Sequence, residues 1–281
     1  MGPTIEDAEG HFLKGNAHYG AGNHDQAIQE YTRALEIRPD LTEVYYNRGI
    51  AYNSGGQYDR AFQDYNKALA LRPDEPGVYN NRGNAYTGKG EHVQAIQDFD
   101  KAIALRPDYP EAYNNRGNAY YNKENYDRAI RDFDKAIGLR PDYTNAYYNR
   151  GLAYDRKGNQ DRAIKDYDQA IGLEPDFAEA YSNRGNVYRR KGDLAQAMKD
   201  YDKAINIKPN NANTYFNRAC LHSLRRDIEQ TVTDLTKSRE LDPSVKPDSK
   251  DEDEQGLAWA RQDPRVRALL GMDKPPKGTE P

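Results

Sequence analysis

The sequence predicts an all-α protein made of tandem helix pairs, and three regularities lead to that fold class. The phrase Tyr-x-Asn-Arg-Gly, one alanine and one proline each recur with a step of 34 residues. The glycines of the phrase are Gly49, Gly83, Gly117, Gly151 and Gly185. The prolines are Pro39, Pro73, Pro107, Pro141, Pro175, Pro209 and Pro243, and the alanines are Ala27, Ala61, Ala95, Ala129, Ala163 and Ala197. A fixed period of this length indicates a repeat protein whose units stack on one another.

Each unit is expected to hold two helices joined by a short turn. In residues 42–75, one face of a first helix is marked by residues spaced four and three apart: Tyr45, Gly49 and Tyr52. After the turn at 53–56, a second helix shows the same spacing: Ala61, Tyr65 and Ala68. Pro73 ends this helix, because proline cannot continue one. Glycine and alanine at these places allow two helix backbones to approach closely.

Seven such units fill residues 8–245: 8–41, 42–75, 76–109, 110–143, 144–177, 178–211 and 212–245. Residues 1–7 are an N-terminal extension in this division. The composition supports the repeat frame against disorder, although Leu, Ile, Val and Phe supply only 43 of 281 residues. Seventeen of the 23 tyrosines fall at phased packing positions, together with the alanines, so aromatic and small side chains supply the core.

The period and the order Tyr, Gly, Tyr, Ala, Tyr or Phe, Ala, Pro resemble the tetratricopeptide repeat (TPR) of bacterial proteins over residues 8–245. The resemblance implies a right-handed α-solenoid, a superhelix of seven tandem TPR helix-turn-helix repeats whose first helices line a concave groove. It also implies a non-catalytic role in protein binding. The family has leucine before the repeat glycine. This chain has a basic residue there: Lys14, Arg48, Arg82, Arg116, Arg150, Arg184 and Arg218.

These basic residues need partners wherever they are partly buried, since an unpaired buried charge is costly. Acidic residues recur in phase on the second helices: Glu30, Asp64, Asp98, Asp132, Asp166, Asp200 and Asp234. We therefore predict a ladder of ion pairs, within a repeat or between neighbours. The alternative is two separately solvated charged faces.

Two asparagine series and four tyrosines lie on the first-helix stripe that should face the groove. The first series is Asn47, Asn81, Asn115, Asn149, Asn183 and Asn217, and the second is Asn16, Asn84, Asn118 and Asn186. The tyrosines are Tyr19, Tyr46, Tyr121 and Tyr148. A carboxamide both donates and accepts hydrogen bonds, so a ladder of them can hold the backbone of an extended peptide. The first series is similar to the asparagine ladder of O-linked N-acetylglucosamine transferase TPR superhelices. The alternative is that these residues only fasten neighbouring helices.

The later units carry basic residues close to their turns: Arg156, Arg189, Arg190, Arg225 and Arg226. This pattern leads to the hypothesis that an acidic segment of a partner docks there, with ordinary surface charge as the alternative. The lysines of the carboxylate clamp found in co-chaperone TPR domains are missing. The corresponding places hold Phe12, Tyr46, Asn80, Asn114, Tyr148, Ser182 and Phe216, so a chaperone-tail adaptor is not expected.

Composition and motifs exclude several other classes. With 41 basic and 45 acidic residues, the chain is not expected to bind nucleic acid through phosphate contacts. No apolar run approaches the roughly 20 residues of a membrane helix, and the first residues do not resemble a signal peptide, so we expect a cytoplasmic protein. The single cysteine, Cys220, permits no internal disulfide. His11 and His18 lack a third metal ligand, and no phosphate loop or catalytic constellation is found. Neither a metal, a cofactor nor an enzymatic activity is expected.

The last 36 residues, 246–281, are expected to contain a linker, a capping helical segment and a disordered tail. The acidic run 251–254 suits a helix N-terminus, and the only tryptophan, Trp259, follows it. A short second helix is predicted with Asp263 as its cap, Pro264 in its first turn and Gly271 as its stop. This segment either covers the open end of the repeats, forms a dimer contact or folds into the groove.

These observations predict a protein-interaction scaffold that takes a partner peptide or helix in its concave groove. The alternative is a regulatory or substrate-recruiting module for an enzyme on another chain. Self-association would use the terminal repeats or the C-terminal segment.

Overall fold

The computed structural model describes residues 5–245 and 256–272, and within these ranges the chain is all-α. The chain divides into two compact units, Met1–Ala146 and Tyr147–Pro281, and the division falls within helix α9 (Thr144–Arg156). The acidic run 251–254 and the expected disordered tail at 273–281 lie outside the described residues, as do residues 1–4 of the N-terminal extension.

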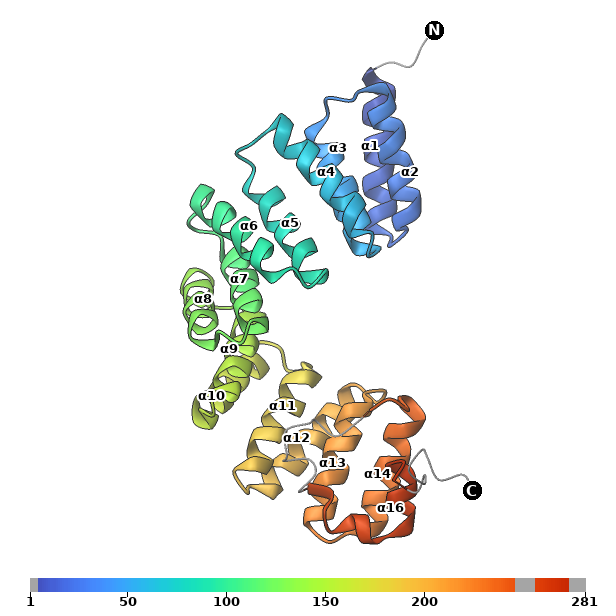
Figure 1. Cartoon of the computed structure of the whole chain (residues 1–281), viewed down its shortest axis with the longest axis vertical. Helices are drawn as coiled ribbons and strands as arrows, with labels where there is room; N and C mark the ends of the chain where they lie inside the picture. The colour runs from blue at the N-terminus through green and yellow to red at the C-terminus, as the bar shows by residue number, and fades with distance from the viewer. Residues whose placement is uncertain (1–4, 246–255, 273–281) are drawn as a thin grey trace, which may run out of the picture. The chain divides into compact units, whose positions relative to one another are not determined.

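Fourteen helices in the described ranges form the seven predicted helix-turn-helix repeats (Figure 1). The first unit contains α1 (Ile5–Gly20), α2 (His24–Ile37), α3 (Thr42–Ser54), α4 (Tyr58–Leu71), α5 (Pro76–Gly88), α6 (His92–Leu105), α7 (Pro110–Asn122) and α8 (Tyr126–Leu139). After α9, the second unit contains α10 (Gln160–Leu173), α11 (Ala178–Arg190), α12 (Leu194–Ile207), α13 (Ala212–Leu224) and α14 (Ile228–Leu241). Helix α16 (Pro264–Leu269) and the 3₁₀ turn η1 (Ala260–Gln262) follow.

The core of each of the first six repeats is built around the contact between the repeat glycine and one aromatic ring of the second helix. A Cβ atom added at Gly49 would stand 2.7 Å from the Tyr65 ring, and one at Gly83 would stand 2.7 Å from the Phe99 ring. The aromatic side chains of this register are all buried: Tyr31, Tyr65, Phe99, Phe133, Tyr167 and Tyr201. Real Cβ atoms do not approach that closely, so even a methyl group is excluded at the glycine. The aromatic ring, and not only the distance between the two helix backbones, therefore requires glycine at this position.

The predicted ion-pair ladder is confirmed for repeats two to seven. Each arginine binds both carboxylate oxygens of the aspartate on its own second helix, at 2.6 to 2.8 Å: Arg48–Asp64, Arg82–Asp98, Arg116–Asp132, Arg150–Asp166, Arg184–Asp200 and Arg218–Asp234. The carboxylates are buried. The Asp98 carboxylate raises the pKa of the Arg82 guanidinium, against the opposing effect of burial. Removing one partner of such a pair would leave a buried charge unpaired.

The same guanidinium groups also tie adjacent repeats together. The remaining nitrogen donates to the preceding second helix at 2.5 to 3.0 Å, with Thr32, Asn66, Asp100, Asp168 and Asp202 among the acceptors. Tyrosine rings flank the cation, as Tyr45 and Tyr52 do at 5.7 and 5.8 Å from Arg48. The pairing is therefore both within a repeat and between neighbours.

The first repeat departs from this pattern. Lys14 is exposed, and Glu30 instead accepts from His11 at 2.6 Å and from Arg33 at 2.5 Å. The His11 hydrogen bond lowers the pKa of Glu30, with Arg33 adding to the effect and burial opposing it. In this repeat His11 and Arg33, and not Lys14, supply the partners of the acidic residue.

The C-terminal segment packs on the last repeat. Leu257, Ala260 and Val266 are buried in one core with Phe216 and Leu235 of α13 and α14. Helix α16 begins as predicted: the Asp263 side chain accepts from the backbone of Arg265, Pro264 occupies the first turn and Gly271 follows with φ of 71°. Arg265 also binds both carboxylate oxygens of Glu229 on α14, at 2.9 and 3.1 Å.

Candidate functional site

The first asparagine series is used in part to join adjacent first helices. Four of these residues donate from Nδ2 to the preceding repeat: Asn47 to Asn16 Oδ1 (3.0 Å), Asn81 to Tyr46 Oη (2.7 Å), Asn115 to Asn80 Oδ1 (3.1 Å) and Asn183 to Tyr148 Oη (2.8 Å). Asn149 and Asn217 lie partly buried on α9 and α13. These four amide groups therefore fasten neighbouring helices, as the structural alternative for the series predicts. Among the described residues, their carbonyl oxygens accept no side-chain bond from another repeat, and Asn115 Oδ1 accepts from Asn114 of its own repeat at 3.3 Å.

The second asparagine series divides into two kinds of residue. Asn16 accepts from the Tyr31 hydroxyl at 2.8 Å, and Asn186 accepts from the Tyr201 hydroxyl at 2.7 Å. In the repeats of Asn84 and Asn118 the corresponding ring is Phe99 or Phe133, which has no hydroxyl to donate. Within the described residues, neither Asn84 nor Asn118 makes a side-chain hydrogen bond to the chain. Their carboxamides are therefore available to a ligand, as is that of Asn217, which also makes no side-chain hydrogen bond within the described residues.

The four groove tyrosines pack against neighbouring rings and polar groups. Tyr19 Oη lies 3.1 Å from Ser54 Oγ, and the Tyr121 ring meets Tyr126 edge-on at 5.4 Å. Tyr46 and Tyr148 accept the asparagine bonds described above, and the Tyr148 ring also contacts Phe177 at 4.8 Å. Burial raises the pKa of the Tyr46 phenol, opposed by the Asn81 hydrogen bond. The Tyr46 phenol therefore stays protonated at neutral pH.

The three arginines expected on the later repeats have different surroundings. Arg156 is exposed at the end of α9, and Arg190 forms an ion pair with Asp155. Arg189 is only 8% exposed. A Cβ added at Gly256 would stand 3.3 Å from Arg189 Nη1 and 3.1 Å from Cys220 Cβ. The C-terminal segment thus covers Arg189, which sequence spacing alone had placed on an open surface.

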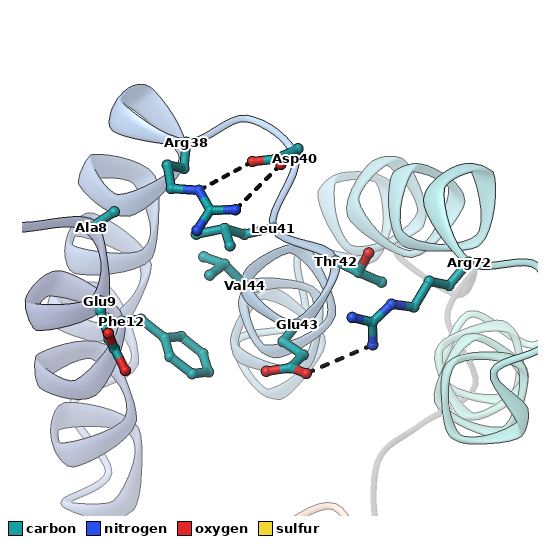
Figure 2. Close-up of a pocket in the computed structure, with 10 residues that line it drawn as sticks. All are labelled: Ala8, Glu9, Phe12, Arg38, Asp40, Leu41, Thr42, Glu43, Val44 and Arg72. Atoms are coloured by element: carbon teal, nitrogen blue, oxygen red, sulfur yellow. Dashed lines mark hydrogen bonds and ion pairs between the residues drawn. The ribbon is translucent and has the colours of Figure 1, made fainter. Parts of the chain in front are cut away.

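Two polar pockets in the first unit occupy the same place two repeats apart. The first has a volume of about 460 Å³ and lies beside α1 and α3 (Figure 2). The second, of about 560 Å³, lies beside α5 and α7. Its lining residues are Asn80, Asn84, Arg106, Asp108, Tyr109, Pro110, Glu111, Asn115, Arg140 and Tyr143. We call it the Asn84 pocket, because it contains one of the two asparagines of the second series that make no side-chain bond to the described chain.

The Asn84 pocket was missed by the sequence analysis. Its two tyrosines, Tyr109 and Tyr143, lie at the junctions between repeats, where no binding role was expected. Its two arginines, Arg106 and Arg140, come directly after second helices, whereas the expected site lay on the first helices. Arg106 lies 3.4 Å from the centroid of the Tyr109 ring, and Arg140 lies 4.8 Å from that of Tyr143. Arg140 also pairs with Glu111, whose carboxylate raises the pKa of this guanidinium. Burial raises the pKa of both phenols.

The described residues contain no group of three His, Cys, Asp or Glu side chains placed to hold a metal ion. None of the helices in these ranges combines the length and apolar character needed to cross a bilayer.

Family models match most of the helix pairs. A model described as TPR repeat matches residues 15–54, 51–90, 83–124, 156–192 and 185–223, and one described as tetratricopeptide repeat matches residues 110–143. The chain belongs to the TPR family. Its helix pairs are therefore TPR units of an α-solenoid protein, a type of domain that generally mediates protein–protein interaction. The matching models describe repeats and no catalytic domain.

Solved structures with the same architecture include several bacterial TPR proteins, whereas no curated protein sequence matches significantly. A TPR protein from Parabacteroides merdae ATCC 43184 is 22% identical with a TM-score of 0.68, covering 91% of this chain and 99% of that one. MamA is 30% identical with a TM-score of 0.52, covering 59% and 96%. YrrB, described as a TPR protein with an unusual peptide-binding site, is 26% identical with a TM-score of 0.51, covering 64% and 92%.

Proposed function

We propose that this TPR protein is a non-catalytic scaffold that binds an extended segment of a partner protein along its first helices. The observation that carries the proposal is the pair Asn84 and Asn118, which stand one repeat apart with no side-chain bond to the described chain. Each carboxamide can donate to a peptide carbonyl and accept from a peptide N–H. Paired main-chain contacts of this kind give affinity with little dependence on sequence. The peptide-binding site reported for YrrB supports the same use of the fold.

Selection of random peptides displayed on phage, followed by affinity measurement with synthetic copies, tests the proposal. We expect Asn84→Ala with Asn118→Ala to weaken peptide binding at least about thirtyfold, since each residue loses at least one hydrogen bond worth roughly 1 kcal/mol. The melting temperature should stay unchanged, because neither residue bonds to the chain. Asn122→Ala is the matched control, an exposed asparagine at the end of α7 outside the predicted site. The proposal is wrong if no peptide binds, or if the double variant binds as tightly as the control.

The alternative, a recruiting module for an enzyme on another chain, predicts a different result from native extracts. A catalytic subunit should then co-purify with the chain at constant stoichiometry, and the double variant should weaken delivery of that enzyme's substrate. If the double variant no longer co-purified with the catalytic subunit, Asn84 and Asn118 would instead be the contact between the two proteins.

A further inference from the structure

A basic residue follows the second helix in several repeats, and it is paired with an acidic residue 29 positions earlier. Arg140 pairs with Glu111 and Lys208 pairs with Glu179 in this way. Arg72 lies 3.7 Å from Glu43 in the same register. The first-helix carboxylate therefore neutralises the cation at the junction between repeats.

The pocket in Figure 2 shows this neutralised arrangement. Its two arginines both have carboxylates beside them: Arg38 donates to both oxygens of Asp40 at 3.3 Å, and Arg72 pairs with Glu43. No cationic group of this pocket is left to attract an anion.

Arg106, in the Asn84 pocket, breaks the pattern. The position 29 residues earlier is Gly77, which supplies no carboxylate. Asp108 occupies the register of Asp40, but Tyr109 has replaced Leu41, and the Arg106 guanidinium lies over the Tyr109 ring instead. Among the described residues, no carboxylate lies within ion-pair distance of Arg106. Stacking on the aromatic ring holds the guanidinium in place without neutralising it.

Arg106 and Asn84 line the same pocket of about 560 Å³. A guanidinium with free N–H groups binds a carboxylate strongly, and a neighbouring carboxamide N–H can donate to the same anion. The other charged groups that line the pocket are Asp108, Glu111 and Arg140, and the last two already pair with each other. Asp108 is the competing anion within the chain.

We propose that the Asn84 pocket binds a carboxylate of the partner peptide, with Arg106 as its cationic contact and Asn84 beside it. This inference rests on the proposed function and adds a specificity to it: the bound segment carries an acidic residue, or a free C-terminus, at this one place. The site lies on the middle repeats, not at the arginines of the later repeats.

Gly77 provides a sharp test, because Gly77→Glu would supply the carboxylate that Glu43, Glu111 and Glu179 provide in their repeats. Gly77→Gln is its matched control: both variants place a Cβ 3.2 Å from Tyr46 Oη, so any strain there is common to both. Phage peptides are selected on the wild type, Gly77→Glu, Gly77→Gln and Arg106→Gln. Each selected peptide is then synthesised with a free or an amidated C-terminus, and with each Asp or Glu changed to Asn or Gln.

We expect peptides selected on the wild type to be enriched in Asp and Glu at one position, and the enrichment to persist on Gly77→Gln. It should disappear on Gly77→Glu and on Arg106→Gln, with affinity for wild-type peptides reduced about three- to fivefold. Loss on amidation assigns the carboxylate to the chain terminus, and loss on Asp or Glu replacement assigns it to a side chain. Peptides that bind through Asn84 and Asn118 without any acidic preference would overturn this inference and leave the proposed function standing. Absence of all peptide binding would remove both.

Discussion

Ala219 and Leu235 show that the repeat glycine and its aromatic partner are one structural unit. In the seventh repeat alanine replaces the glycine and leucine replaces the ring, and both remain buried. The smaller side chain leaves room for the methyl group that a tyrosine or phenylalanine ring would exclude. Two positions 16 residues apart in the sequence are thus coupled by volume, which is expected of residues in direct contact.

A double-mutant cycle in the second repeat tests this coupling. We expect Gly49→Ala to lower the free energy of unfolding by about 1–3 kcal/mol through overpacking. Tyr65→Leu alone should also destabilise, but the double variant should lose less than the sum, since it reproduces the pair of the seventh repeat. Chemical denaturation measures all three. Gly138→Ala is the control, because a Cβ there meets nothing within 4 Å. Additive effects of the two changes would contradict direct coupling.

At the scale of elements, the C-terminal segment completes the last repeat. Helix α14 has no eighth repeat to pack on, and the segment supplies the missing apolar surface through Leu257, Ala260 and Val266. It also covers Cys220, which is fully buried beside Gly256. Terminal repeats generally need such a cover, since one of their faces would otherwise be exposed to solvent.

The Cys220 thiol therefore reports whether the segment is docked. Leu257→Ala should destabilise this core by about 2–5 kcal/mol and accelerate the reaction of Cys220 with a thiol reagent at least about tenfold through more frequent local opening. Met272→Ala, in the same segment but 52% exposed, should leave the rate unchanged. Equal rates in all three proteins would show that another element shields the thiol. If deletion of 246–281 left folding intact but abolished self-association, the segment would be a dimer contact.

At the scale of the whole molecule, contacts run between consecutive helices. Within each unit, the described helices contact their neighbours in the chain, and the first helices of adjacent repeats also touch, such as α3 with α5 or α11 with α13. A solenoid held together in this way has a stability that is nearly a sum of repeat and interface contributions. Destabilisation should therefore remain local.

Hydrogen exchange measured by mass spectrometry tests this expectation. Gly49→Ala should reduce amide protection mainly in α1 to α6 and leave α11 to α16 close to the wild type, because coupling in repeat proteins acts mainly between neighbouring repeats. A uniform loss of protection along the described chain would instead indicate a single cooperative unit.

The candidate site was predictable only in part. The asparagine series was found by its spacing, but the spacing could not distinguish Asn84 from Asn16. That difference depends on Phe99 replacing Tyr31 in the register of the second helix, which leaves the asparagine without a hydroxyl to accept from. The sequence contained the signal, yet its meaning depended on knowing that the two side chains touch. Arg106 was missed because the position that could supply its carboxylate partner lies on another helix, where the chain has Gly77.

The sequence by itself determined the number of repeats and the two helices of each, because both follow from the 34-residue period and local helix chemistry. It predicted the arginine–aspartate pairs but left two separately solvated charged faces as the alternative. The tertiary structure decided which polar groups remain for a partner. Arg189 became buried beneath the C-terminal segment, while Arg106 stayed without a carboxylate in a pocket. The position of a residue in the 34-residue repeat assigns it to one face of a helix. Only the packing of several elements determines whether its hydrogen-bonding groups are already paired within the protein.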